Sequence, residues 1–212
     1  MTDIYLERGA KKSIVSSLEW PGWCGFGKSE GQAIQAFINM EARYRVIAQR
    51  AGLNFEPGDP VVVEEVAGDA TTDWGAPSII FAADRNPIDA AEVERRVALL
   101  RVGWEVMDET IAGSPAELRK GPRGGGRERD EIARHVIEAE RAYARKIGVR
   151  HKPFPFNDCS ALSAMREEIV EVLSKPSDGS ALVPGGWPTV YAIRHIAWHV
   201  IEHIWEMEDR RV

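Results

Sequence analysis

The chain has 212 residues and a formal net charge of −6, with 44% hydrophobic and 28% charged residues. This composition is typical of a folded globular protein, and the negative charge argues against nucleic acid as the main partner. No apolar run reaches the roughly 18 residues that span a bilayer, so we expect no membrane partner. The N-terminus, MTDIYLERGAKK, lacks the apolar core of a signal peptide, and two cysteines make no disulfide framework. We therefore expect a cytoplasmic protein.

The first 66 residues predict a small α/β module. Residues 4–7 and the alternating stretch 12–20 are expected strands. The sequence SEGQ (29–32) has the form of a capping box, so a helix is expected from there to about residue 52. After the turn-forming sequence EPGDP, the run VVVEEV (61–66) predicts a further strand. The expected order is ββαβ.

The segment LEWPGWCGFGKSEGQAIQAF (18–37) resembles the strand–turn–helix of the HicB-like antitoxin family. In that family a turn of the Pro-Gly-Cys type is followed by a Gly-Lys/Asp-Ser/Thr cap and a helix. The resemblance covers the first third of the chain. It implies a ββαβ module over residues 1–66 that either binds a partner protein or serves as a scaffold.

Residues 67–88 show no periodicity and are rich in Gly, Pro, Asp and Thr. We interpret them as a linker that packs on the surface through its apolar side chains, Trp74, Ile79, Ile80 and Phe81. From residue 89 onward the pattern changes to consecutive helices.

Four amphipathic helices are predicted between residues 89 and 212. Their expected spans are about 89–112, about 128–147, about 159–174 and a last helix that contains HIAWHVIEHIWEMED (195–209). Connections of roughly ten to fifteen residues make an antiparallel four-helix bundle the expected arrangement. The predicted fold class is therefore α+β, with a small N-terminal module, a linker and a helical bundle.

Three of the five histidines lie in the last helix, each four residues after the one before: His195, His199 and His203. Four residues advance a helix by about 400° and roughly 6 Å, so the three form one slanting row. On the helical wheel, His203 lies within about 20° of the centre of the apolar face, His199 about 60° from it and His195 about 100°. If only two of them face the core, they are His199 and His203. Two imidazoles one turn apart can present two nitrogen ligands to one metal ion.

His135 is the candidate third ligand, because it flanks the apolar stripe of the helix expected over 128–147. Three neutral imidazoles with an open position suit one divalent metal ion, with Zn²⁺ or Ni²⁺ as the leading candidates. Glu138 is either a hydrogen-bond acceptor for a ligating ring or a solvated charge. The alternative for the whole cluster is a set of hydrogen-bonded core histidines.

The sequences RHVIEAERAY (134–143) and HVIEH (199–203) resemble those of the DinB/YfiT-like four-helix proteins, over residues 89–210. In that family a histidine on the second helix joins an HxxxH pair on the last helix to hold a divalent metal. The resemblance implies three metal ligands, His135, His199 and His203. A further histidine one turn before the pair is a non-ligand position in the family, and His195 matches it.

The resemblance also implies an activity. Some members are similar to thiol S-transferases or isomerases, so it implies a metal-dependent thiol transferase or hydrolase-like enzyme acting on a small molecule with a low-molecular-weight thiol. Many members follow the last ligand with Arg-Gly-Gln, whereas this chain has Ile204-Trp205-Glu206. That departure puts the inherited reaction in doubt.

The loop RKGPRGGGRERD (119–130) carries four glycines and five basic residues just before a helix. Through Arg123 and Arg127 it is a candidate binding site for a carboxylate or phosphate of the substrate. The alternative is a solvated connection.

Trp198 and Trp205 form a second apolar face on the last helix together with Tyr191. This face needs cover either from the N-terminal module or from a second copy of the chain in a homodimer. Two functions compete for the whole protein: a metal-dependent enzyme, and a non-catalytic protein-interaction or stress-related protein whose histidines are structural. A third alternative is a metal bound only for stability.

Overall fold

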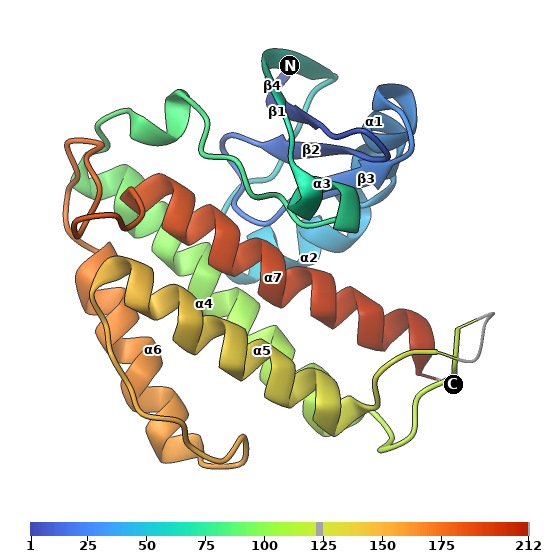
Figure 1. Cartoon of the computed structure of the whole chain (residues 1–212), viewed down its shortest axis with the longest axis vertical. Coiled ribbons are helices and arrows are strands. Elements are labelled where there is room, and N and C mark those ends of the chain that lie inside the picture. Colours follow the sequence, from blue (N-terminus) through green and yellow to red (C-terminus); the bar gives the residue numbers. More distant parts are fainter. Residues whose placement is uncertain (122–124, 212) are drawn as a thin grey trace.

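A computed structural model describes residues 1–121 and 125–211. The described chain is α+β, with a four-stranded sheet and seven α-helices (Figure 1). Its elements in chain order are β1 (Thr2–Arg8), β2 (Ser13–Ser17), β3 (Cys24–Gly27), α1 (Glu30–Asn39), α2 (Glu41–Arg50), β4 (Pro60–Ala67), α3 (Ala70–Trp74), the 3-10 turn η1 (Ala83–Arg85), α4 (Ala90–Gly113), α5 (Arg129–Ala144), the 3-10 turn η2 (Arg145–Ile147), α6 (Cys159–Leu173) and α7 (Thr189–Arg210).

The sheet has the strand order β3-β2-β1-β4. β2 pairs antiparallel with both β1 and β3, whereas β4 lies parallel to β1. A parallel pair needs a crossover connection, which α1 and α2 provide. The predicted ββαβ order is therefore corrected to βββααβ. The third strand, Cys24–Gly27, has four residues of which two are glycines, too few for a periodic signal, and the expected single helix is interrupted at Met40.

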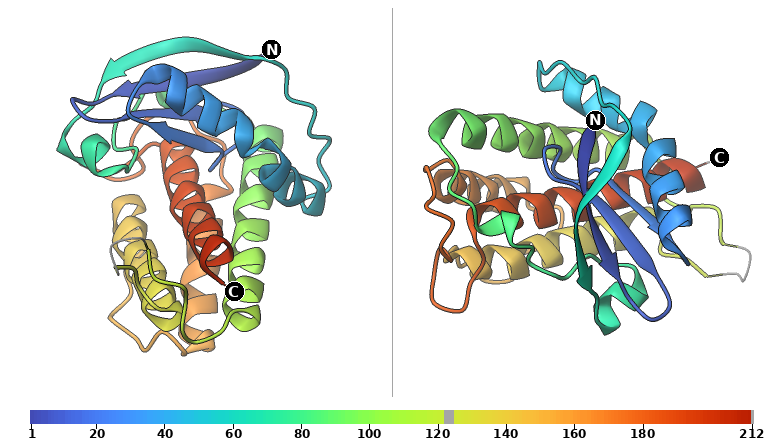
Figure 2. Two further views of the ribbon diagram at one scale, coloured as in Figure 1. Left: turned by 90° about the vertical axis from the view of Figure 1, so that its right-hand side faces the viewer. Right: turned by 90° about the horizontal axis from the view of Figure 1, so that it is seen from above.

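Four long helices, α4 to α7, pack around a shared core below the sheet (Figure 2). α4 and α7 run in one direction, and α5 and α6 run in the opposite one (Figure 1). The α4/α5 and α6/α7 pairs are antiparallel as predicted, but α5 and α6 are parallel, and residues 148–158 carry the chain back between them. Eleven extended residues reach about 36 Å and a helix of 16 residues is about 24 Å long, so this connection length allows either arrangement. No helix in the described part of the chain combines the length and the apolar character needed to cross a membrane.

α7 lies between the sheet module and the other long helices, and its second apolar face is covered by the module of the same chain. The ring of Trp198 lies 6.5 Å from that of Phe26 on β3, and the guanidinium of Arg43 on α2 lies 5.3 Å from the ring centre of Trp205. One continuous hydrophobic core runs through both parts. The N-terminal module therefore supplies the cover that the sequence left open between two alternatives.

The turn at Gly22 explains how closely the module approaches α7. Gly22 has a φ of +90°, which favours glycine. A Cβ at this position would lie 2.5 Å from the Cδ1 atom of Ile201 and 3.0 Å from the carbonyl carbon of Ala197. Only glycine fits here. The Pro-Gly turn therefore reverses the chain and also lets the N-terminal module approach α7 closely.

The predicted surface linker, residues 67–88, packs on the rest of the chain, and at Phe81 and Asp84 it packs more deeply than predicted, between β1 and α7. Phe81 is 1% exposed and stacks on Tyr5 of β1, with ring centres 4.1 Å apart. The guanidinium of Arg194 on α7 lies 5.2 Å from the ring centre of Phe81. The segment therefore connects the two parts of the fold through buried contacts.

The four apolar residues of this segment differ in burial. Phe81 is buried as expected, and Ile79 and Ile80 are half-buried. Trp74 is 83% exposed, so the prediction that it packs is wrong. The tight contacts come instead from an acid, Asp84, which is fully buried against Arg194. Polarity made this segment resemble a linker, whereas here a buried ion pair holds it in place.

Candidate metal centre

The candidate site is built on α5 and α7, which lie side by side and run in opposite directions (Figures 1 and 2). His199 and His203 lie one turn apart on α7, so both rings leave the same face of the helix. His135 comes from α5 and meets them across the helix pair.

The three predicted ligands form one cluster in which a ring nitrogen of each lies within 4.8 Å of the others. The Nε2 atoms of His199 and His135 are 3.2 Å apart. Two nitrogens that share a tetrahedral Zn²⁺ at about 2.0–2.1 Å lie about 3.3 Å from each other, so this pair has the separation that a common ion requires. Within residues 1–121 and 125–211, no other group of three His, Cys, Asp or Glu side chains is close enough to share an ion. The convergence predicted from spacing is confirmed, and the side chains fit a metal.

A carboxylate on α7 holds one ring of the cluster. The Nδ1 atom of His203 lies 2.7 Å from Oε2 of Glu206, whose Oε1 accepts a hydrogen bond from Arg210 at 2.8 Å. With Nδ1 engaged, Nε2 is the nitrogen that remains for an ion, as when a ligating histidine donates its other N–H to a carboxylate. The sequence offered Glu138 either for this supporting role or as a solvated charge, and its exposure agrees with the solvated charge. The spacing of three residues between His203 and Glu206 is the signal that could have found the acid.

The electrostatics favour the neutral, metal-binding form of two of the three rings, His135 and His199. Burial lowers the pKa of His199 well below its usual value, and the neighbouring His203 and His135 lower it further. Burial, then the charges of His203 and Arg127, also lower the pKa of His135. Burial alone would raise the pKa of Glu206, but its hydrogen bond with His203 and the nearby cations outweigh burial and lower it. At neutral pH the imidazoles of His135 and His199 are therefore neutral and the carboxylate of Glu206 is ionised, which are the forms that suit metal binding.

His195 lies outside the cluster, which agrees with the non-ligand position expected for it. Its ring packs among Tyr143, Trp187 and Tyr191, with ring centres 4.7, 4.9 and 5.2 Å away. Burial, then the charge of Arg194, lowers the pKa of His195 to about 3. Tyr143 also contacts the ring of His199, so these aromatic side chains form one wall beside the candidate centre.

The basic loop lies next to the same centre. Its ends are tied down, since the Arg119 N–H donates to the Arg210 carbonyl at 2.9 Å and Lys120 pairs with Glu128. Arg127 is exposed, and its charge acts on His135 and His199. Arg123 lies outside the described residues. Of the two residues predicted for the anion site, Arg127 is therefore the one whose position the structure describes, and the anion site stays a prediction.

No family model matches the chain, and no curated protein and no solved structure is significantly similar to it. The resemblances to the DinB/YfiT-like and HicB-like families therefore stay predictions. Function has to be argued from the site itself.

Proposed function

We propose that this protein is a divalent-metal-dependent enzyme whose ion is held by His135, His199 and His203. Zn²⁺ or Ni²⁺ is the favoured ion, because three neutral imidazoles are a ligand set that suits late divalent metals. At least one coordination position stays free for a small molecule. The best candidate reaction is an S-transfer or isomerisation that uses a low-molecular-weight thiol.

The observation that supports this proposal most directly is the 3.2 Å separation between ring nitrogens of His135 and His199, which come from different helices. Protonated imidazoles would repel at this distance, and neutral ones can form only one hydrogen bond between them. A shared ion would use both lone pairs. The lowered pKa values of these two rings favour the same state.

The surrounding side chains suggest how a substrate would be held. A metal ion with an open position supplies Lewis acidity and lowers the pKa of a bound thiol. Arg127 offers a positive charge at the exposed side of the cluster, suited to a carboxylate or phosphate on the substrate. Tyr143 and the aromatic wall restrict access of water from the other side. Glu206 fixes the orientation of the His203 ring.

Metal analysis of tag-free protein is the first test. We expect about one ion per chain in wild type and its loss in His135→Ala and His203→Ala, whereas His151→Ala, which removes a histidine paired with Glu168 elsewhere, should keep it. Full occupancy in the two cluster variants would contradict the proposal.

A Co²⁺-substituted sample then tests for the open position. Addition of a low-molecular-weight thiol should produce a thiolate-to-metal charge-transfer band. A bound ion with no spectral response to thiol would indicate a metal that serves stability alone.

A second function deserves the same test. The His135–His199 contact and the His203–Glu206 hydrogen bond also make a self-contained polar cluster that needs no metal. In that case the protein is a non-catalytic interaction protein, and its N-terminal module is the part that contacts a partner. Metal-free protein with unchanged thermal stability would favour this alternative.

A further inference from the structure

A second candidate site lies on the other side of α5 from His135. A groove of about 550 Å³ runs between α4, α5 and α6, where α6 is inclined to the other two helices (Figure 1). This volume lies within the range of about 300–1,000 Å³ that is usual for small-molecule sites. From α5 it is lined by Ala133, Val136 and Ile137, whereas His135 faces α7.

The walls of the groove are apolar. Met107 of α4, Val136 of α5 and Leu162 of α6 belong to the hydrophobic core and also line the groove. The rings of Trp104 and Phe156 complete the lining. An apolar molecule placed here would continue the core of the helices, and the contact would be driven by removal of this surface from water.

The two arginines that line the groove are both paired with carboxylates. Arg101 makes two hydrogen bonds to Glu167, at 2.8 and 2.9 Å. Arg166 binds Asp108 at 3.0 Å on one side and Glu140 at 3.3 Å on the other. A carboxylate head would have to displace one of these pairs, and an ammonium head would have Glu105 as its remaining partner, whose side chain is 64% exposed and can contribute little to binding.

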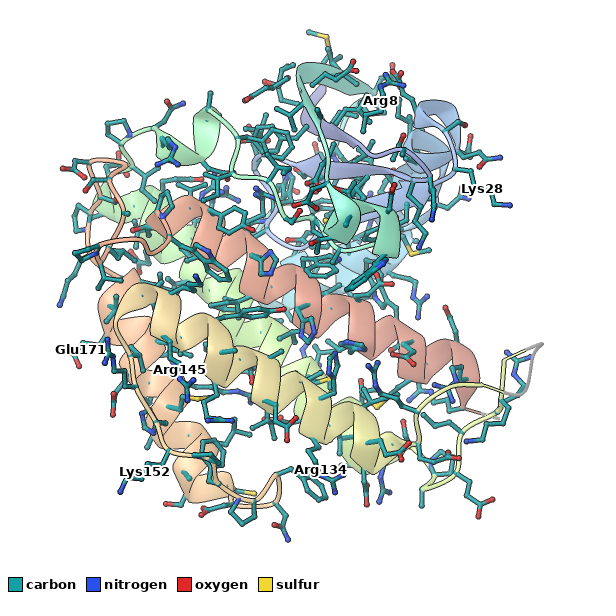
Figure 3. The ribbon with its side chains drawn as sticks, viewed as in Figure 1. Arg8, Lys28, Arg134, Arg145, Lys152 and Glu171 are labelled. Carbon is teal, nitrogen blue, oxygen red and sulfur yellow. The ribbon has the colours of Figure 1, made fainter. Side chains whose placement is uncertain are left out.

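The Nε–H of Arg166 is a buried donor that makes no hydrogen bond. The exposed fraction of this residue is 8%. A small movement of this side chain would open the Nε–H to an uncharged acceptor oxygen, such as a carbonyl or hydroxyl, and the ion pairs could stay in place. Near the start of α6, Arg134 stacks on the ring of Phe156 at 5.2 Å, and Figure 3 shows Arg134 at the lower edge of α5.

We propose that this groove binds an uncharged small molecule with an apolar, ring-containing body and one hydrogen-bond acceptor. The site is separate from the candidate metal centre and does not depend on it.

Cys159 provides a direct probe of occupancy. It lines the groove and is exposed, whereas the other cysteine, Cys24, is buried. A chromogenic disulfide reagent should therefore modify one thiol in the folded protein. We expect phenylbutanone to slow this reaction at least tenfold at saturation. Phenylbutylamine and phenylbutanoate carry the same body with a charged head and should bind several-fold more weakly.

Two variants localise the binding. Ser163 lines the groove on the exposed side of α6, so Ser163→Trp should fill it and abolish both the protection and the heat of binding in calorimetry. Ala164→Trp is the matched control, because Ala164 is exposed on the same helix and does not line the groove. Its affinity for phenylbutanone should stay within twofold of wild type.

Each possible result of these binding experiments either supports the proposed site or overturns it. Binding of phenylbutanone that Ser163→Trp removes and Ala164→Trp retains supports the assignment. Absence of binding in calorimetry, or equal loss in both variants, overturns the site. Tighter binding of the amine or the carboxylate than of the ketone overturns the assignment of an uncharged ligand.

Discussion

α7 buries basic side chains on two faces. The two faces differ in whether a buried carboxylate neutralises the basic group. Toward the sheet, Arg194 is 1% exposed and is neutralised by Asp84, which is fully buried. Toward α5, His199 and His203 are buried beside His135, and the Glu206 carboxylate contacts the Nδ1 atom of His203 at the edge of this cluster. Burial lowers the pKa of Arg194, but Asp84 outweighs it and raises the pKa, so the arginine keeps its charge. Burial instead lowers the pKa of His135 and of His199, so these two imidazoles are neutral at neutral pH.

The difference distinguishes a structural site from a candidate ligand site. A buried cation that already has its counter-charge has no net charge left to attract an ion. A group of neutral nitrogens with converging lone pairs can still accept a cation. Each of the following experiments changes one side of this comparison.

The largest effect is expected at the sheet-facing pair. Asp84→Ala leaves the guanidinium of Arg194 buried without a counter-charge, which costs about 3–5 kcal/mol. Urea denaturation should show this loss, and the double variant Asp84→Ala/Arg194→Met should recover much of it because no lone charge remains. A single variant as stable as wild type would show that the pair is solvated.

Zinc should stabilise the protein through the other face. An ion that binds only the folded state adds about 2.7 kcal/mol when its free concentration is one hundred times the dissociation constant. Thermal denaturation with and without zinc should show this gain in wild type and in Asp84→Ala, but not in His203→Ala. An equal gain in His203→Ala would place the ion elsewhere.

Acid should weaken the metal-free protein through His195. Its pKa is about 3 in the folded state against 6.5 for the free group. As the pH falls below 6.5, the unfolded chain takes up a proton that the folded chain does not, so stability falls by at most about 1.4 kcal/mol per pH unit until the pH nears 3. Between pH 6.5 and pH 5 this amounts to about 1.6 kcal/mol, because the unfolded group is only half protonated at pH 6.5.

The control for this prediction is the pH dependence of His195→Gln. Denaturation midpoints of the chelator-treated variant should depend less steeply on pH, whatever its absolute stability. An unchanged slope would assign the acid sensitivity to His199, whose pKa is also lowered by burial.

The sequence predicts the helices of this fold better than its layers. Long amphipathic spans leave a strong periodic signal, so α4, α6 and the row of histidines on α7 were expected close to where they lie. The direction of α6 was not predictable. Residues 148–158 are long enough either to reverse the chain at one end of α5 or to carry it back along the whole helix.

Contacts between distant parts of the chain leave no recognisable pattern in the local sequence. Asp84 and Arg194 are 110 residues apart, and nothing in the spacing of either predicts that they meet. The polar character of residues 67–88 is therefore typical both of a linker and of a layer held by a buried ion pair. The three histidines were predictable because two of them share a helix face, and the third flanks the apolar stripe of another helix.

The smallest effect separates two carboxylates that spacing alone does not distinguish, since each follows a histidine of the cluster by three residues. Glu206 accepts a hydrogen bond from His203 at 2.7 Å, whereas Glu138 is exposed beside His135. Loss of a carboxylate that orients a ligating ring weakens metal binding by about 10–100-fold, and the partial exposure of Glu206 places it near the lower value. Competition with a chromogenic chelator should therefore show about tenfold weaker zinc binding in Glu206→Gln and no change in Glu138→Gln. Equal effects in the two variants would mean that net charge near the cluster, rather than the orientation of His203, sets the affinity.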